Sequence, residues 1–342
     1  MTMVDVLSEL HEKYGELVNK AIERYLTIGV DPSFRETVLY QVATGGKRIR
    51  PLMVIESALA CGGSLESALP YAAIVELIHN YSLIYDDIID EADLRRNMPT
   101  VRRKYGDYAA ILVGIWYREA IEEAVLDTRN PSEVARVVAE TIKAIDEGER
   151  LDILMEYSGR RDPYFIENRL VREITPALRD LYIRMISLKT AALFKTSMWL
   201  GGYSAKCGNE QLEALSNFGY NVGVAFQIID DVLDIFGDLR KFGKEIGKDL
   251  KEHKVGNLVI LLSLLESKEA NKLLNVLSKQ RPTQDDVKEA VEVISATKAR
   301  EEAIRMANEY MSKAISELSK VPRNEHTMKL EELAKFIVYR EY

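Results

Sequence analysis

Long hydrophobic runs are missing from this sequence. The longest stretch without a charged residue covers the 16 positions 214–229, and it is interrupted by Asn217, Asn221 and Gln227. A membrane-spanning helix needs roughly 20 apolar residues, so no membrane span is expected. Residues 1–25 have the pattern of a charged amphipathic helix and not that of a signal peptide. We therefore expect a cytoplasmic protein that would hold an apolar ligand in its interior.

Cysteine is equally scarce. Cys61 and Cys207 are the only two in the sequence, and they lie in none of the spacings that are typical of metal sites or redox motifs. Because a free cysteine commonly behaves as a small buried apolar residue, we expect two buried thiols.

Positive charge is not in excess. Lys and Arg number 46, Asp and Glu number 54, and the formal net charge is −8. This balance argues against a general nucleic-acid-binding protein. The basic residues are nevertheless clustered, at 47–50, 95–96 and 102–104. Local basic clusters on an acidic protein favour a small anionic ligand over a long polyanion.

Strand-like alternation is rare and helical periodicity prevails. No linker rich in Gly, Ser or Pro divides the chain. We therefore predict one all-α domain over residues 1–342, a large helical bundle around a central cavity. The expected helices lie near 4–26, 33–44, 51–60, 68–93, 106–127, 131–157, 177–200, 209–236, 257–276, 284–296, 297–319 and 326–340.

The most informative feature is an acidic pattern that occurs twice, in Asp86-Asp87-Ile88-Ile89-Asp90 and in Asp230-Asp231-Val232-Leu233-Asp234. Each copy ends a nearly uncharged stretch, and helical spacing places its first and last aspartates on one face. Three carboxylates at the end of an apolar helix repel one another and resist desolvation. Two such triplets make sense if Mg²⁺ ions bind between them together with a polyanion, because magnesium prefers oxygen ligands and phosphate groups.

Basic side chains near the triplets fit the same idea. A diphosphate of about −3 held with magnesium would need about three of them, and Arg95, Lys189 and Lys244 are candidates. Residues 45–51 read as a turn followed by a helix start that is rich in phosphate donors. Residues 243–249 form a lysine-bearing segment that could close over a bound anion.

A di-iron site is the competing metal interpretation. Glu76 and His79 have the E-x-x-H spacing of di-iron carboxylate bundles. The other histidines are His11, His253 and His326, and none follows a Glu by three residues. The second half of a di-iron site is therefore missing, and His79 is interpreted as a phosphate donor or a core histidine.

Taken together, these residues resemble the trans-prenyltransferases, the polyprenyl diphosphate synthase family. The likeness covers about 45–254 and depends on the two acidic motifs in this order, with Arg95-Arg96 after the first, Gln227 before the second, and Lys189-Thr190 between them. It implies the isoprenoid synthase fold, a homodimer, and condensation of isopentenyl diphosphate with an allylic diphosphate.

The resemblance also implies a role for each site residue. Two to three Mg²⁺ ions, or Mn²⁺, would be held by Asp86, Asp87, Asp90, Asp230 and Asp234, with Asp231 supporting them through water. The allylic diphosphate would be bound by Arg95, Lys189 and Lys244, with Lys254 near its phosphates and Thr190 and Gln227 near the allylic carbon. Isopentenyl diphosphate would be bound by Lys47, Arg50, His79 and Arg96.

Product length is predicted from the helix that leads to Asp86. Tyr81 lies five residues earlier, about 7.5 Å along a helix axis, and Ser82 beside it is small. In relatives, one aromatic residue at this position goes with a C20 product, whereas aromatics at both positions suggest C15. We therefore expect geranylgeranyl diphosphate, although ordinary core packing would also explain Tyr81.

The sequence departs from the family pattern at several positions. Tyr85 replaces a usual His, Asn97 a usual Gly, Ile115 a usual Asp and Glu149 a usual Gln, and the segment 159–177 is longer than in many relatives. None of these changes removes a proposed metal ligand.

Three other functions remain open at this point. A farnesyl or longer-chain synthase would use the same residues. A class I terpene cyclase shares the first acidic pattern but usually lacks the second and the basic site for isopentenyl diphosphate. A regulatory subunit of a heteromeric synthase typically loses acidic ligands, and here all six remain.

Overall fold

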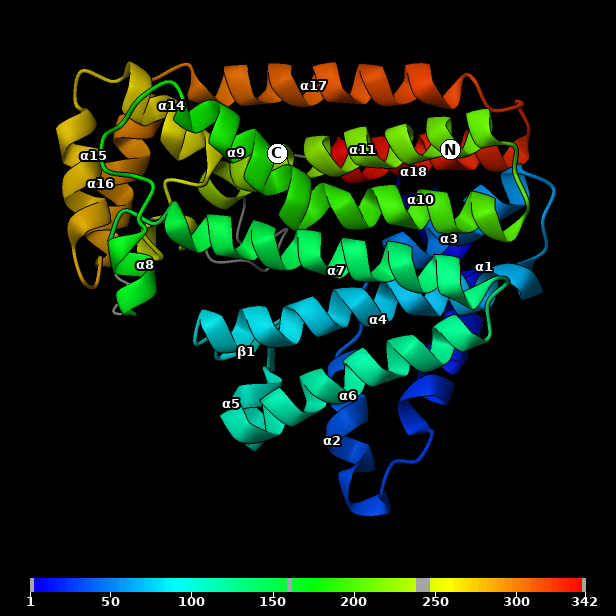
Figure 1. Cartoon of the computed structure of the whole chain (residues 1–342). Helices are drawn as coiled ribbons and strands as arrows, with labels where there is room; N and C mark the ends of the chain where they lie inside the picture. Colours follow the sequence, from blue (N-terminus) through cyan, green and yellow to red (C-terminus); the bar gives the residue numbers. More distant parts are fainter. Residues whose placement is uncertain (1–2, 159–161, 238–246, 340–342) are drawn as a thin grey trace. The chain divides into compact units, whose positions relative to one another are not determined.

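The computed structural model describes residues 3–158, 162–237 and 247–339. Helices form nearly all of their regular structure, which confirms the all-α prediction (Figure 1). Within these ranges the only strands are β1 (Leu94–Arg95) and β2 (Met98–Pro99). None of the described helices combines the length and apolar character needed to cross a membrane.

The chain divides into two compact units, which are described separately. Unit 1 comprises Met1–Lys143, Ala192–Tyr220 and Lys313–Phe336, and unit 2 comprises Ala144–Ala191, Asn221–Ser312 and Ile337–Tyr342. Four helices contribute to both units: α7 (Pro131–Leu154), α11 (Asn209–Phe236), α17 (Ala299–Leu318) and α18 (Glu325–Val338). A single domain over the whole chain stays a prediction.

Unit 1 is built around α4 (Leu65–Ile89), which packs most extensively against four other helices (Figure 1). These neighbours are α1 (Met3–Thr27), α3 (Ile49–Ala60), α6 (Asp107–Leu126) and α10 (Ala192–Ser204). Every residue from Tyr71 to Ile78 is buried, as expected for a helix that is apolar on all sides. Two shorter helices, α2 (Pro32–Ala43) and α5 (Val101–Tyr105), complete the unit.

The ends of α4 are set by local chemistry. Ser64 and Ser67 form a capping box at its start. Beyond Ile89 the chain turns into the β1–β2 hairpin, in which Arg96 and Asn97 have φ values of 54° and 62°. Two central residues in the left-handed region are what a tight two-residue hairpin requires. The prediction that this helix continues to residue 93 was therefore wrong.

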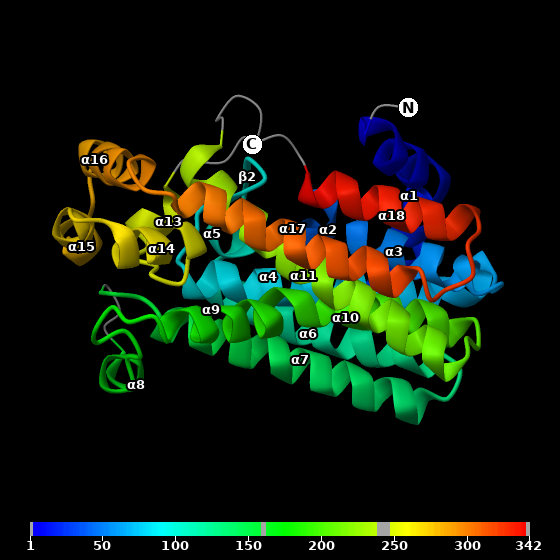
Figure 2. The ribbon, with the colours of Figure 1, turned by 90° about the horizontal axis from the view of Figure 1, so that it is seen from above.

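Unit 2 contains shorter helices. They are α8 (Pro163–Glu167), α9 (Leu178–Ile186), α13 (Lys248–Lys251), α14 (Leu258–Glu266), α15 (Ala270–Ser278) and α16 (Gln284–Ser295). Figure 2 shows α15 and α16 side by side, in agreement with their direct packing. The helix expected over 257–276 is two helices, because Ser267 has an extended backbone. A π-helical turn η1 (Ser187–Ala191) interrupts the helix expected over 177–200.

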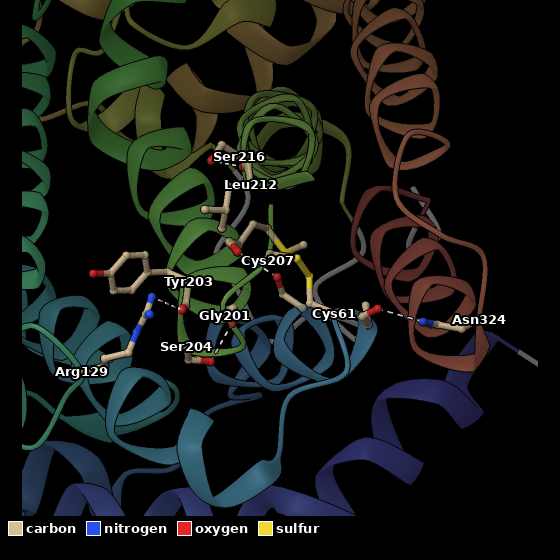
Figure 3. Close-up of a disulfide and its surroundings, with 12 residues drawn as sticks. Cys61, Arg129, Gly201, Tyr203, Ser204, Cys207, Leu212, Ser216 and Asn324 are labelled. Carbon is tan, nitrogen blue, oxygen red and sulfur yellow. Dashed lines mark hydrogen bonds between the residues drawn. A yellow bond between two sulfur atoms is a disulfide. The ribbon is translucent and has the colours of Figure 1, made fainter. Parts of the chain in front are cut away.

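The two cysteines form a disulfide and are half-buried, so the prediction of two buried thiols was wrong (Figure 3). Cys61 caps the C-terminus of α3, Cys207 follows α10, and their Cα atoms are 5.6 Å apart. The two segments meet closely, because a Cβ placed on Gly63 would lie 2.6 Å from the Ala205 side chain. Sequence spacing gave no sign of this pairing, since 146 positions separate the cysteines.

Candidate functional site

The first acidic motif occupies the C-terminal turn of α4. Asp87 is buried, with 2% of its surface exposed, whereas Asp86 and the C-cap residue Asp90 are partly exposed. Arg95 of the hairpin pairs with two of the three carboxylates. Its Nε donates to Asp87 Oδ1 at 2.8 Å, and its Nη2 donates to Asp86 Oδ2 at 2.7 Å. The hairpin missed in the sequence thus places a predicted phosphate ligand directly on the motif.

These carboxylates suit a divalent cation. Asp86 and Asp87 already converge on one cationic group, and carboxylate oxygens are the donors that Mg²⁺ prefers. In the described parts of the chain, no three acidic, histidine or cysteine side chains form a complete ligand set. Magnesium usually takes one or two carboxylates and completes its shell with water and substrate phosphates.

The second motif, on α11, repeats the same exposure pattern. Asp230 and Asp234 are partly exposed, one helical turn apart, whereas Asp231 between them is 4% exposed. Both motifs therefore present their first and last carboxylates and bury the second. Helical spacing places the first and last carboxylates on one face and the second on another, and the packing of each helix decides which face is buried.

Asp231 is held by three donors. Its Oδ2 accepts from Tyr182 Oη at 2.7 Å and from Leu258 N at 2.9 Å, and its Oδ1 accepts from Gln227 Nε2 at 3.0 Å. Burial, reinforced by the nearby Asp249 carboxylate, raises the pKa of Asp231 to about 8. Asp231 is therefore placed to fix α11 and the Gln227 amide.

Gln227 is oriented from both ends. Its Oε1 accepts from Thr190 Oγ1 at 2.7 Å, while its Nε2 is bound to Asp231. Thr190 lies in the π-helical turn η1, and such turns often occur at functional sites. The structure thus brings together Thr190 and Gln227, two residues predicted to act near the same substrate carbon.

The chain after the second motif folds back onto it. The backbone N–H of Gly247 donates to Asp234 O at 2.7 Å, and that of Asp249 donates to Asp234 Oδ2 at 3.2 Å. Asn257 Nδ2 in turn donates to Asp249 Oδ2 at 2.8 Å. The predicted phosphate ligand Lys244 lies outside the described residues.

Lys189 stands in an acidic environment. Its Nζ lies 2.7 Å from Asp152 Oδ2 and 2.6 Å from Glu149 Oε2. Lys254, the other predicted phosphate ligand here, lies 3.4 Å from the same Asp152 oxygen. The close approach depends on Gly148, because a Cβ there would lie 2.2 Å from the Lys189 backbone nitrogen.

The residues predicted to bind isopentenyl diphosphate lie in unit 1. Lys47 is exposed and Arg50 is half-buried against the ring of Phe194. Arg96 donates through Nη1 to the carbonyl of Gly45. Burial lowers the pKa of His79 well below its usual range, and the positive charges of Arg50, Arg96, Arg95 and Arg48 lower it further. These charges and His79 therefore form one electropositive cluster.

Tyr81 and Ser82 are both half-buried on α4. The Tyr81 ring packs edge-on against Tyr85, with centroids 5.1 Å apart. Tyr85 fills the space over Gly114, where a Cβ would lie 2.5 Å from its ring. Tyr85, which stands where the family usually has His, therefore forms an aromatic pair with Tyr81, the residue predicted to limit product length.

Several residues of this network were not predicted. Tyr182 and Asn257 carry no signal in the sequence, because each acts through a contact with a residue distant in the chain. Asp152 lies three residues after Glu149, which was noted only as a departure from the family pattern. Arg48 is 4% exposed, and the sequence does not distinguish it from the other basic residues of the cluster 47–50.

Known proteins that are similar to this chain belong to the family that the two acidic motifs indicated. Residues 31–294 match the model of the polyprenyl synthetase family. The geranylgeranyl diphosphate synthase of Saccharolobus solfataricus is 34% identical over 96% of this chain and 97% of its own. A short chain isoprenyl diphosphate synthase of Methanocaldococcus jannaschii is 37% identical over 73% of this chain and 72% of its own. The crystal structure of geranylgeranyl pyrophosphate synthetase from Pyrococcus horikoshii superposes with a TM-score of 0.85, at 32% identity, and covers 98% of this chain and 99% of that one. The chain therefore belongs to the polyprenyl synthetase family, as its two acidic motifs predicted.

Proposed function

We propose that this prenyltransferase condenses isopentenyl diphosphate with an allylic diphosphate and yields mainly geranylgeranyl diphosphate. The main support is the arrangement that the two motifs share. Each has two partly exposed carboxylates one helical turn apart at the end of an apolar helix. The proposal requires both motifs to serve one bound diphosphate.

About two to three Mg²⁺ ions, or Mn²⁺, would be held by Asp86, Asp87, Asp90, Asp230 and Asp234, and would neutralise diphosphate charge. Asp231 supports this set indirectly, because its own oxygens are occupied by Tyr182, Gln227 and Leu258. Arg95 would serve as the counter-charge of the first motif and as a phosphate donor.

The basic residues supply the remaining charge. Arg95, Lys189 and Lys244 would donate to the allylic diphosphate, with Lys254 near its phosphates. Donors aimed at a leaving group stabilise the negative charge that grows on it as the allylic C–O bond breaks. Lys47, Arg50, His79 and Arg96 would hold isopentenyl diphosphate. His79 would act as a neutral donor, because its pKa is depressed.

The chemistry needs no nucleophilic side chain. The leaving diphosphate takes the electron pair of the C–O bond, the double bond of isopentenyl diphosphate attacks the allylic cation, and the diphosphate takes up the proton that is released. The oriented Gln227 amide and Thr190 would lie beside the cation. Apolar side chains around the tail would keep water from quenching it.

Tyr81 would limit the growing chain. Its ring packs against the Tyr85 ring. Ser82, the next residue in the chain, is small and would leave more space for a prenyl chain than an aromatic residue would. One bulky residue at this depth supports a C20 product over C15 or a much longer chain.

A second copy of this chain is the proposed partner. Tyr108, Ile111, Leu112 and Ile115 repeat at helical spacing along α6 and are between 38% and 88% exposed. An apolar stripe on one helix can pair with its own copy across a twofold axis. Analytical ultracentrifugation of the wild type and of Leu112→Glu would test it, with dissociation expected for the variant.

The cytoplasm is the proposed compartment, because isoprenoid diphosphates are charged small molecules and no described helix spans a membrane. The Cys61–Cys207 disulfide counts against it, since stable disulfides are rare in reducing compartments. Free thiols should be counted in protein that is alkylated directly in its own cells. Two free thiols per chain would support the cytoplasm, and none would support an oxidising compartment.

Purified protein should be incubated alone with Mg²⁺, isopentenyl diphosphate and C5, C10 or C15 allylic primers, and the products separated by chain length. A C20 diphosphate is expected. Cyclic hydrocarbons would indicate a terpene cyclase, and no product without a second polypeptide would indicate a regulatory subunit. Asp86→Asn and Asp230→Asn should each lower kcat by about 10²-fold or more, whereas Asp162→Asn, at an exposed helix start, should not.

A further inference from the structure

Arg48 is a basic residue that the proposed reaction does not use. It is 4% exposed, whereas its neighbour Lys47 is exposed. A guanidinium has five N–H donors, and four hydrogen bonds from Arg48 end on the protein itself. The acceptors are Asn19 Oδ1 at 3.0 Å, Gly45 O at 3.2 Å, Glu76 Oε1 at 2.8 Å and Val42 O at 3.0 Å. These bonds hold Arg48, at the end of the loop 44–48 between α2 and α3, to acceptors of the protein itself and leave it turned away from a bound substrate.

The charge of Arg48 is matched by Glu76 of α4. Both side chains are 3% exposed, which makes this a buried ion pair. Asn80, one turn along α4, donates from Nδ2 to Glu76 Oε1 at 3.2 Å and to Glu76 O at 2.8 Å. Breaking one partner of such a pair leaves an uncompensated buried charge, so the pair holds the loop against α4.

The backbone of the loop needs such support. Arg48 itself has φ 50° and ψ 30°, a left-handed conformation that is uncommon for residues other than glycine. A side chain at Gly46 would displace both guanidinium groups, because a Cβ there would lie 2.7 Å from Arg96 Nη1 and 3.0 Å from Arg48 Nη1. The left-handed turn directs Lys47 outward while Arg48 points into the core.

The same loop is tied to the hairpin. The Gly45 carbonyl accepts from Arg48 and also from Arg96. Arg95, next in the chain to Arg96, binds Asp86 and Asp87. A single carbonyl therefore connects the buried pair with the hairpin that contacts the first acidic motif.

We propose that Arg48 is a positioning residue for isopentenyl diphosphate: its buried pair with Glu76 fixes the loop so that Lys47, Arg50 and Arg96 converge on one diphosphate. This inference depends on the proposed function, which assigns those three residues to that substrate.

The test compares Arg48→Lys with the wild type in steady-state kinetics. Lysine keeps the charge but cannot reach four acceptors at once. Because a displacement of about 1 Å can cost up to about 10²-fold, the KM for isopentenyl diphosphate should rise roughly 10- to 100-fold. The KM for the allylic substrate should stay within about twofold. Glu76→Gln, which keeps an acceptor but removes the charge, should shift the same KM in the same direction and serves if Arg48→Lys does not fold.

The matched control is Glu56→Gln. Glu56 is also a fully buried carboxylate of unit 1, bound to His326 Nδ1 at 2.8 Å, but it does not contact the loop. It should lose thermal stability without a change in the KM for isopentenyl diphosphate. An unchanged KM in both pair variants, or an equal rise in both KM values, would overturn the positioning role. An inactive wild type would instead refute the proposed function.

Discussion

Reduction of the Cys61–Cys207 disulfide should lower thermal stability by a measurable amount. The bond joins two residues of unit 1 that lie 146 positions apart in the sequence. Chain-entropy estimates give about 5 kcal/mol for a loop of this size, and native disulfides typically contribute about 2–4 kcal/mol. For 342 residues, an unfolding entropy of about 2.1 cal/mol/K per residue converts about 2–5 kcal/mol into a decrease of about 3–7 °C in Tm.

The bond also joins segments that make other contacts. Asn324, near the start of α18, donates from Nδ2 to the Ala60 carbonyl at 2.9 Å, beside Cys61 (Figure 3). Reduction should therefore lower the stability of the folded chain against unfolding and leave the folded active site intact. Activity at low temperature should not change.

Differential scanning calorimetry with and without a phosphine reductant is the assay, and a Cys61→Ala/Cys207→Ala double variant is the control. The double variant should melt at the temperature of the reduced wild type and should not respond to reductant. Two free thiols per chain in the denatured, unreduced protein would show that no bond forms. A reduced wild type with an unaltered Tm would refute the energetic reasoning.

The remaining predictions concern the site. Glu149→Gln removes one of the carboxylates that pair with Lys189, so the KM for the allylic diphosphate should fall about two- to tenfold; an unchanged KM would contradict it. His79 stays neutral in the folded protein below pH 6.5, while the unfolded chain takes up a proton there, so stability should be present above that pH and be lost as pH falls below it. Melting curves between about pH 5 and about pH 7.5 should show this loss, and His79→Gln should reduce it. Tyr81→Ala should give products longer than C20 by chromatography, whereas Tyr85→Phe, which keeps the ring, should not.

The helices were predictable where a whole face or a whole helix is apolar. The stretch before Asp86 gave α4, and the uncharged run 214–229 gave α11. The hairpin at 94–99 was missed because its strands have two residues each and its turn is Arg96-Asn97, without glycine. The break at Ser267 was missed for a similar reason, since apolar residues continue on both sides of it.

The site was predictable to the extent that its chemistry repeats. Two aspartate triplets with basic neighbours indicated the family. What they could not indicate was which member of each group is buried. Asp87, Asp231 and Arg48 have the same residue types as their exposed neighbours, and only the packing of α4, α11 and the loop after α2 separates them.

The π-helical turn at Ser187–Ala191 makes this enzyme sensitive to the deletion of a single residue at one place in the polypeptide. Such a turn is an α-helix with one residue too many, and that extra residue gives Lys189 and Thr190 their placement. Deleting a single position there would give an ordinary helical turn that still folds. The Lys189 side chain would then turn away from Asp152, and the Thr190 side chain would turn away from Gln227. A deletion of one codon would therefore give a protein that folds but has no activity.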